Sequence, residues 1–203
     1  MQDQDYAQPM KKLTEITLKS LDDLKIVIRH VKKSDMHGVW KNFNEVLEEG
    51  IYLPVFTPVR TEWEKKTWYD NLKKEKEMCI VAENQELKSP DNIVGQCELS
   101  NLQWEASIHV FSLGIIVRKE YRDQGLGRAL IDMAIREAKN AFNKEKIILS
   151  CFSTNARGIH LYESMGFKKV GMRKRQFHMN STYYDEILYE LFIDDYLTEN
   201  INA

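Results

Sequence analysis

A strand pattern, a glycine-containing turn and an amphipathic helix follow one another in the middle of the chain. The run SIHVFSLGIIV (107–117) is apolar and rich in β-branched residues, which is typical of a strand. Apolar residues then recur at helical spacing from Leu126 to Ala138, with Gly125 and Gly127 at the start of this helix. Glycine costs a helix about 1 kcal/mol relative to alanine, so two glycines here indicate that a backbone or a ligand approaches closely.

The rest of the chain alternates strand and helix patterns without repeats or low-complexity segments. Strands are predicted at 24–31, 78–84, 93–100, 146–152, 167–179 and 182–193, and helices at 35–48, from Thr61 onward and at 155–165. This element order predicts a single α/β (α+β) domain with a mixed sheet of about seven strands. We place the domain at residues 23–203 and an N-terminal arm at residues 1–22.

Composition excludes several function classes. The chain has 203 residues and a formal net charge of −2, so no basic excess indicates nucleic-acid binding. No apolar run reaches the ~18–20 residues of a membrane helix, and the N-terminal residues lack the apolar core of a secretion signal. The three cysteines form no CxxC pair and the five histidines show no metal-ligand spacing. We therefore expect a cytoplasmic protein with reduced cysteines and no bound metal.

The glycine turn predicts a phosphate site, because a helix start offers unpaired N–H groups and the positive end of the helix dipole. Two familiar phosphate motifs do not fit. A P-loop requires a Lys-Ser or Lys-Thr pair after its last glycine, and none is present. A dinucleotide fingerprint requires a third glycine where this chain has Leu130.

A third motif, R-x-x-G-x-G after a strand, does fit residues 122–127. It resembles the pyrophosphate loop of the GCN5-related N-acetyltransferase (GNAT) superfamily. The segment NARGIHLYESMGF (155–167) resembles the second signature of that superfamily, N-x-x-A-x-x-x-Y-x-x-x-G-F, with Gly158 in place of the usual alanine. The resemblance extends over about residues 93–193. Within the superfamily, this sequence is similar to the ribosomal-protein, amino-acid and antibiotic N-acetyltransferase branches.

The resemblance implies a GNAT-like fold with helices on both faces of the sheet, and with the fourth and fifth strands splayed to admit acetyl-CoA. Gly114, inside the fourth strand, indicates either a bulge or a close approach of another group. The turn amides would hold the pyrophosphate, with Arg122 supplying charge, and the preceding strand would pair with the pantetheine arm. The implied cofactor-binding residues are Ile115, Ile116, Val117, Arg122, Asp123, Gln124, Gly125, Leu126, Gly127, Arg128 and Asn155.

For catalysis, the resemblance implies direct attack of an amine on the thioester of acetyl-CoA. Tyr162 is the expected proton donor to the leaving thiolate, and a backbone N–H near Ile115 or Ile116 is the expected oxyanion donor. One branch of the family places a glutamate five residues before the asparagine, where this chain has Ser150. Glu98 is the best replacement base, acting through water, and His109 is an alternative that more simply fills a core or groove.

The acceptor amine is left open between a protein N-terminus, a polyamine and a small amine such as an antibiotic. Glutamates 45, 48, 49 and 62 either attract a cation or form solvated helix faces, and Tyr52, Phe56, Trp63 and Trp68 either wall an acceptor groove or fill the core. The expected partners are acetyl-CoA and an amine, with no nucleic acid and no membrane, and a homodimer is a further expected assembly. The alternative function is a non-catalytic acyl-CoA-binding or sensing module.

Overall fold

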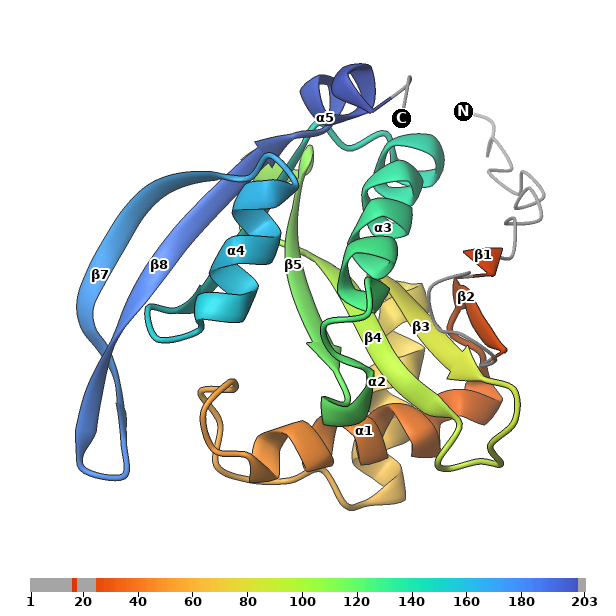
Figure 1. Cartoon of the computed structure of the whole chain (residues 1–203). Coiled ribbons are helices and arrows are strands. Elements are labelled where there is room, and N and C mark those ends of the chain that lie inside the picture. The colour runs from red at the N-terminus through yellow and green to blue at the C-terminus, as the bar shows by residue number, and fades with distance from the viewer. Residues whose placement is uncertain (1–15, 18–24, 201–203) are drawn as a thin grey trace.

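The computed structural model describes residues 16–17 and 25–200, whose strands form one mixed sheet (Figure 1). The strand order is β1-β2-β3-β4-β5-β6-β8-β7, and only the β5–β6 pair is parallel. The strands are β1 Ile16–Thr17, β2 Ile26–His30, β3 Met78–Asn84, β4 Ile93–Asn101, β5 Val110–Val117, β6 Lys146–Phe152, β7 Lys168–Met179 and β8 Thr182–Phe192. The predicted α/β fold is confirmed, with β1 added at one edge.

Helices cover both faces of this sheet, as predicted. They are α1 Met36–Glu48, α2 Glu62–Lys74, α3 Leu126–Phe142, α4 Ala156–Ser164 and α5 Ile193–Glu199. In Figure 1, α3 and α4 lie in front of the sheet and α2 lies behind it. The larger core forms under α3, α4 and α5, and a smaller one joins α1 and α2 to the other face through Val39, Leu72 and Val81.

The sheet opens between β5 and β6. Residues 110–112 of β5 pair with residues 146–148 of β6, and no pairing follows beyond them. From there β5 stays with β4 as far as Val117, whereas β6 stays with β8 as far as Phe152. The predicted splay is confirmed: the fourth and fifth strands of the sequence analysis are β5 and β6 of the structure. Open α/β sheets bind ligands at the carboxyl ends of parallel strands, which is where this opening lies.

The short helix α4 shows how local sequence sets this region. Asn155 caps its first turn, because its side-chain oxygen accepts a hydrogen bond from the Gly158 N–H at 3.0 Å. Gly166 ends the helix at a φ of 90°, and the Phe167 N–H then donates to the Tyr162 carbonyl at 3.1 Å. Phe167 is buried in the core as a result, which anchors the C-terminal end of α4 to the sheet.

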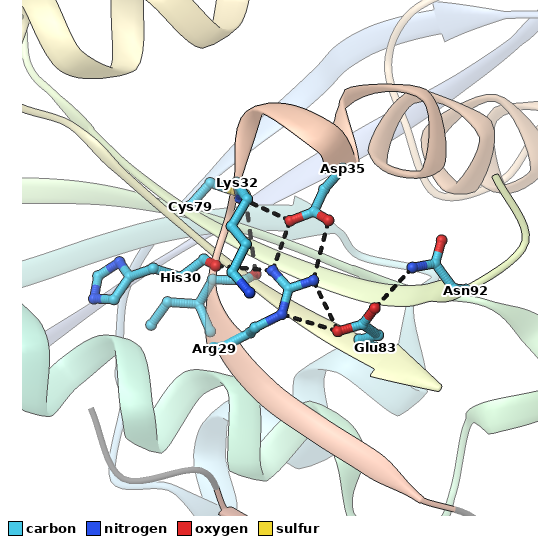
Figure 2. Close-up of polar contacts among 8 residues, drawn as sticks. Arg29, His30, Lys32, Asp35, Cys79, Glu83 and Asn92 are labelled. Carbon is cyan, nitrogen blue, oxygen red and sulfur yellow. Dashed lines mark hydrogen bonds and ion pairs between the residues drawn. The ribbon is translucent and has the colours of Figure 1, made fainter. Parts of the chain in front are cut away.

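A polar network fixes the entry into α1 at the far end of β2. The Arg29 guanidinium binds Asp35 at 2.6 and 3.0 Å and Glu83 at 2.8 and 2.9 Å (Figure 2). Asn92 donates to the other Glu83 oxygen at 2.9 Å. Asp35 is buried, so these bonds supply the partners that a desolvated carboxylate needs. The network therefore ties the start of α1 to β3 and to the turn before β4.

Several expectations differ from the structure. The strand expected from residue 107 begins at Val110, because Glu105–Ser107 form a short 3-10 helix. The β4–β5 register runs without a shift past Gly114, so the bulge is wrong and a close approach is the interpretation that stays open. Helix α5 was not predicted, because its seven residues hold too few apolar side chains for a clear period. Within the arm only β1 is described, and the proposed 22/23 boundary lies outside the described residues.

Candidate active site

A cavity of about 450 Å³ lies at the opening between β5 and β6. It brings together most of the residues implied by the two motifs. Those that line it are Ile115, Ile116, Val117, Arg122, Asp123, Gly125, Gly127, Arg128, Asn155 and Tyr162. Gln124 and Leu126 do not line it, and the Leu126 side chain is buried in the core, so only its backbone is near the turn surface.

The backbone of β5 presents unpaired groups to this cavity. The Arg118 N–H donates to the Val94 carbonyl, and the register continues from there without a shift. In an antiparallel ladder alternate residues bond to the partner strand, so the even-numbered residues of β5 bond to β4. The N–H groups of Leu113, Ile115 and Val117 therefore face the opening. Ile115 and Ile116 were the two expected oxyanion donors. This alternation of hydrogen bonds favours Ile115, because its N–H faces the opening.

The glycine turn contains two residues with a positive φ. Gly125 is the N-cap of α3 with a φ of 82°, and Asp123 also has a positive φ, of 61°. No side chain caps the first turn of α3, so its N–H groups face outward without a side-chain partner. A Cβ at Gly127 would lie 3.1 Å from the Leu161 side chain, so this glycine also permits the close packing of α3 on α4.

The Arg122 side chain is held by the protein itself. Its Nε donates to the Val117 carbonyl at 2.8 Å, and its two terminal nitrogens bind both carboxylate oxygens of Glu49. The guanidinium also lies over the Tyr52 ring, 4.7 Å from its centroid. The hydrogen bonds that Arg122 donates to Glu49 raise the pKa of Arg122. The positive charge that we expected to bind phosphate is therefore paired with a carboxylate of the protein. Arg122 also connects the glycine turn to the end of α1.

Two other arginines lie at the same end of the cavity with lighter constraints. Arg128 donates to the Ser164 hydroxyl at 2.6 Å, and Arg157 pairs with Asp123 at 2.8 Å. Both arginines are exposed and both line the cavity. Because these pairs are at the surface, they are weak and an anion can compete for them. This end of the cavity thus carries more positive than negative charge.

Tyr162 projects from α4 between two other aromatic rings. Its centroid lies 6.0 Å from the rings of both Phe167 and Tyr189, which fixes its position. The side chain is buried yet lines the cavity, and burial raises the pKa of Tyr162 well above its usual range. The phenol therefore keeps its proton throughout the ordinary pH range.

The two expected bases lie in different surroundings. Glu98 faces α2, where both its carboxylate oxygens accept from the Trp68 Nε1 at 3.2 Å, and burial raises the pKa of Glu98 despite this bond. It does not line the cavity, but its cross-strand partner Gly114 does. His109 is exposed before β5 and away from the cavity lining, so the expectation of a core or groove histidine is wrong. Ser150 lines the cavity.

Sequence reasoning missed part of the lining. Cys151 and Phe152 at the end of β6 and Phe177 on β7 belong to it, as do Val46 and the loop residues 52–54. Phe152 and Phe177 pack edge to face with centroids 4.8 Å apart. The position of Cys151 and Phe152 just before the Asn155 motif was a usable signal. Phe177 had none, because it reaches the site only through the pairing of β7 with β8 and β8 with β6.

The acidic and aromatic residues of the α1–α2 region divide between the two earlier interpretations. Glu45 pairs with Arg118, Glu49 with Arg122 and Glu62 with Lys65, so these three serve as ion-pair partners. Tyr52 lines the cavity and Trp68 packs against the smaller core. Trp63 and Phe56 are exposed to 75% and 69%, so they neither line the cavity nor pack in a core.

Comparison with known proteins identifies the family. The family model described as "Acetyltransferase (GNAT) family" matches residues 47–167, which is more than half of the chain. The chain belongs to the GNAT family of acetyltransferases. The matched segment contains the cavity-lining turn, α3, β6 and α4, so the family signal and the cavity coincide.

Curated GNAT relatives match over short segments. A spermidine N(1)-acetyltransferase of Vibrio cholerae is 31% identical over 94 residues, which are 46% of this chain and 53% of that protein. An N-alpha-acetyltransferase of Saccharolobus solfataricus is 36% identical over 66 residues, 32% of this chain and 38% of that protein. The matches thus span about half or less of these relatives.

Solved structures share the fold over a longer range. A phosphinothricin acetyltransferase of the GNAT superfamily from Sinorhizobium meliloti, in complex with acetyl-CoA, superposes with a TM-score of 0.74 at 17% identity. The alignment covers 82% of this chain and 88% of that one. At this identity the likeness establishes the GNAT fold alone.

Two further observations concern the described residues only. None of the helices in residues 25–200 is long and apolar enough to cross a membrane. No group of three or more His, Cys, Asp or Glu side chains is arranged there to hold a metal ion.

Proposed function

We propose that this GNAT protein is an acetyl-CoA-dependent N-acetyltransferase that acetylates a primary amine by direct attack. The observation that carries the proposal is the single cavity surface shared by the glycine turn, the free edge of β5 and Tyr162. The names of the curated relatives, spermidine N(1)-acetyltransferase and N-alpha-acetyltransferase, support an amine acceptor. The free cysteines 79, 97 and 151 support a reducing, cytoplasmic location.

The described residues fit acetyl-CoA. The outward N–H groups at the start of α3, together with Arg128 and Arg157, would hold the pyrophosphate. The outward amides of Leu113, Ile115 and Val117 would pair with the peptide-like bonds of the pantetheine arm, as in strand addition. A Cβ at Gly114 would meet nothing within 4 Å, so the space beside β5 is open for such a chain.

Acetyl-CoA supplies a thioester whose carbonyl carbon accepts the amine nitrogen while the C–S bond breaks. The Ile115 N–H would donate to the carbonyl oxygen as negative charge develops on it. Tyr162 would give its phenolic proton to the departing sulfur, since its raised pKa keeps that proton in place until the thiolate forms. Glu98 would take the proton of the incoming ammonium through water at Gly114, because the carboxylate lies behind this side-chain-free position.

A second candidate function is a non-catalytic acyl-CoA-binding or sensing module. Two observations favour it: Ser150 replaces the glutamate of one active branch, and Glu98 stands outside the cavity lining. Both functions require the same cofactor end of the cavity. They differ in whether the remaining part of the cavity supports proton removal from an amine.

Thiol release distinguishes the two candidates. Purified protein is mixed with acetyl-CoA and, separately, with single primary amines and N-terminal peptides, while acetyl-CoA binding is measured by calorimetry. If the protein is an N-acetyltransferase, thiol release should depend on the amine and should be absent without protein. Tight binding of acetyl-CoA without release for any amine would support the sensing module. Absence of binding would contradict the assignment of the cavity itself.

A further inference from the structure

The cavity has two chemically different ends, set by the two faces of the sheet. On β6, Cys151 packs toward the core under α3 and α4, so its neighbours Ser150 and Phe152 face the α1–α2 side. Arg128 and Arg157 belong to α3 and α4 at the other end, and Arg122, which is paired with Glu49, lies between the two ends over the Tyr52 ring. We call the part lined by Val46, Tyr52, Leu53, Pro54, Phe152 and Phe177 the acceptor end.

The acceptor end is apolar and aromatic. Val46 comes from α1, Phe152 from β6 and Phe177 from β7, and the two phenylalanines pack against each other with centroids 4.8 Å apart. Tyr52 and Leu53 close it from the α1–α2 loop. That loop is held in place because Asn44 exchanges two hydrogen bonds with the Val59 backbone, at 2.8 and 3.0 Å. A positioned, largely apolar wall favours an apolar ligand group.

No carboxylate lines the acceptor end. Among the described residues that line the whole cavity, the acidic one is Asp123, which belongs to the glycine turn and pairs with Arg157. Three carboxylates on neighbouring elements have cationic partners: Glu45 has Arg118, Glu49 has Arg122 and Glu186 has Arg173. Glu48 on α1 and Glu163 on α4 have no cationic partner among the described contacts, but both are exposed and lie outside the cavity lining.

Glu98 differs from these acids because it is largely buried and has no cationic partner among its described contacts. Its described hydrogen bonds come from the neutral Trp68 indole, and it lies outside the cavity lining, opposite Gly114, which does line the cavity. Glu98 is therefore the largely buried carboxylate beside the cavity that has no cationic partner among its described contacts. One such carboxylate is enough for a single amine, and a second ammonium group would lose water without gaining a counter-charge.

We infer that the acceptor is a monoamine carried next to an apolar or aromatic group, with no second charge close to the amine. This inference rests on the proposed N-acetyl transfer and names its substrate class. It separates the chain from a polyamine acetyltransferase, because several ammonium groups would need several free carboxylates. It also disfavours a free amino acid, because no unpaired cation lines the acceptor end to receive its carboxylate.

The first test is a matched panel of amines with acetyl-CoA at saturation. Phenylethylamine, phenylalaninamide and a short peptide amide beginning with phenylalanine carry the proposed group. Free phenylalanine adds one carboxylate and spermidine adds further ammonium groups. We expect kcat/KM for the first three to exceed that for phenylalanine and spermidine by roughly tenfold or more, the usual effect of a buried unpaired charge. A preference for the peptide over phenylethylamine assigns a protein N-terminus as the source, and the reverse assigns a small molecule.

The outcomes separate this inference from the proposed function. Preferred acetylation of spermidine or of free phenylalanine would overturn the inference and leave N-acetyl transfer intact. No acetylation of any amine would overturn both. Calorimetric titration of phenylethylamine into the protein with bound coenzyme A gives a readout that is independent of turnover, and stronger binding of spermidine there would also count against the inference.

Substitutions at Leu53 test the acceptor end directly. Leu53→Glu places a carboxylate in it, and Leu53→Gln has the same shape without the charge. We expect both variants to lower kcat/KM for phenylethylamine, and only Leu53→Glu to raise the spermidine-to-phenylethylamine ratio, by about tenfold. Phe56→Glu adds the same charge to the same loop outside the cavity lining and should leave the ratio unchanged. An equal ratio in all three variants would overturn the assignment of the acceptor end.

Discussion

At the scale of single residues, burial acts on Tyr162 and Glu98 in the same direction but with opposite consequences. It raises the pKa of both groups above their usual values. For the tyrosine this keeps the phenol protonated and makes it a weaker acid. For the glutamate it makes the charged form costly to hold in the folded protein and makes it a stronger base once formed.

We expect Tyr162→Phe to lower kcat by ~10²-fold or more with little change in the KM for acetyl-CoA, because the proton is needed only as the C–S bond breaks. The ring keeps its contacts with Phe167 and Tyr189, so the melting temperature should stay close to that of the wild type. Steady-state kinetics and thermal melting check this. Wild-type turnover with chemistry shown to be rate-limiting would make Tyr162 a packing residue.

We expect Glu98→Gln to lower kcat while raising stability at neutral and alkaline pH. The raised pKa means that the folded state opposes the charged carboxylate, so stability is lost as pH rises through that pKa, and the glutamine variant avoids this loss. Below the ordinary glutamate pKa of about 4.3 the carboxyl is protonated in both states and the difference should disappear. Denaturant unfolding across pH measures this. Lower stability of the variant at pH 8 would contradict it.

At the scale of elements, the glycine turn and the helices α3 and α4 form the phosphate end. Gly127 is where α3 approaches α4, because its missing side chain leaves room for Leu161. Gly114 serves β5 differently, because its missing side chain leaves open cavity instead of a packed contact. Gly127 therefore has a packing role, and Gly114 keeps space open for a ligand.

Gly127→Val should weaken acetyl-CoA binding by tenfold or more and also destabilise the protein, because a Cβ there lies only 3.1 Å from the Leu161 side chain and valine adds two methyl groups to this close contact. Gly114→Ala should weaken binding without destabilising the fold, because its Cβ meets no protein atom within 4 Å. Gly171→Ala on β7 is a control with only an ordinary contact, at 3.6 Å from Leu188. Calorimetry and thermal melting measure both effects, and unchanged binding by a folded Gly127→Val protein would contradict the turn assignment.

At the scale of the whole molecule, α1 is connected by ion pairs to the segments around the cofactor end. Lys41 pairs with Asp91, Glu45 with Arg118 and Glu49 with Arg122, at four-residue intervals along one side of the helix. The last pair joins the end of α1 to the glycine turn, and Arg122 also covers Tyr52 of the acceptor end. The two ends of the cavity are thus mechanically linked through one guanidinium.

We expect Arg122→Ala to raise the KM values of both substrates and to lower the free energy of unfolding by about 1–3 kcal/mol, the cost of leaving a partly buried partner unpaired. Because Glu49 already neutralises the guanidinium, the loss of acetyl-CoA affinity should not grow at low salt. Arg122→Lys should retain only part of the wild-type stability and substrate affinity, since lysine cannot bind both carboxylate oxygens of Glu49 in the bidentate geometry of arginine.

A double-mutant cycle with Glu49→Gln checks the link between Arg122 and Glu49. Coupling of about 1 kcal/mol or more is expected for this partly buried pair. Additive effects together with a larger loss of affinity at low salt would instead indicate that Arg122 acts directly on the phosphates.

The sequence by itself determined the local units of this protein. The strand, glycine turn and helix at residues 110–142, the Asn155 cap and the Gly166 end of α4 follow from propensities and spacings within a few residues. Residues within one such unit keep their relative positions in any compact fold. Gly125 and Gly127 belong to one such unit and Tyr162 to another, so their place in one cavity was predicted from the resemblance of both motifs to one family.

Only the tertiary structure decided which distant residues complete the site. Arg122 is bound by Glu49, 73 positions away, and Glu98 by Trp68, 30 positions away. Phe177 reaches the cavity through two further strand pairings. With 29 basic and 31 acidic residues in the chain, many ion pairs satisfy charge equally well, and local periodicity does not distinguish them. The choice is made by burial and sheet register, which bring one partner within reach and leave the others in solvent.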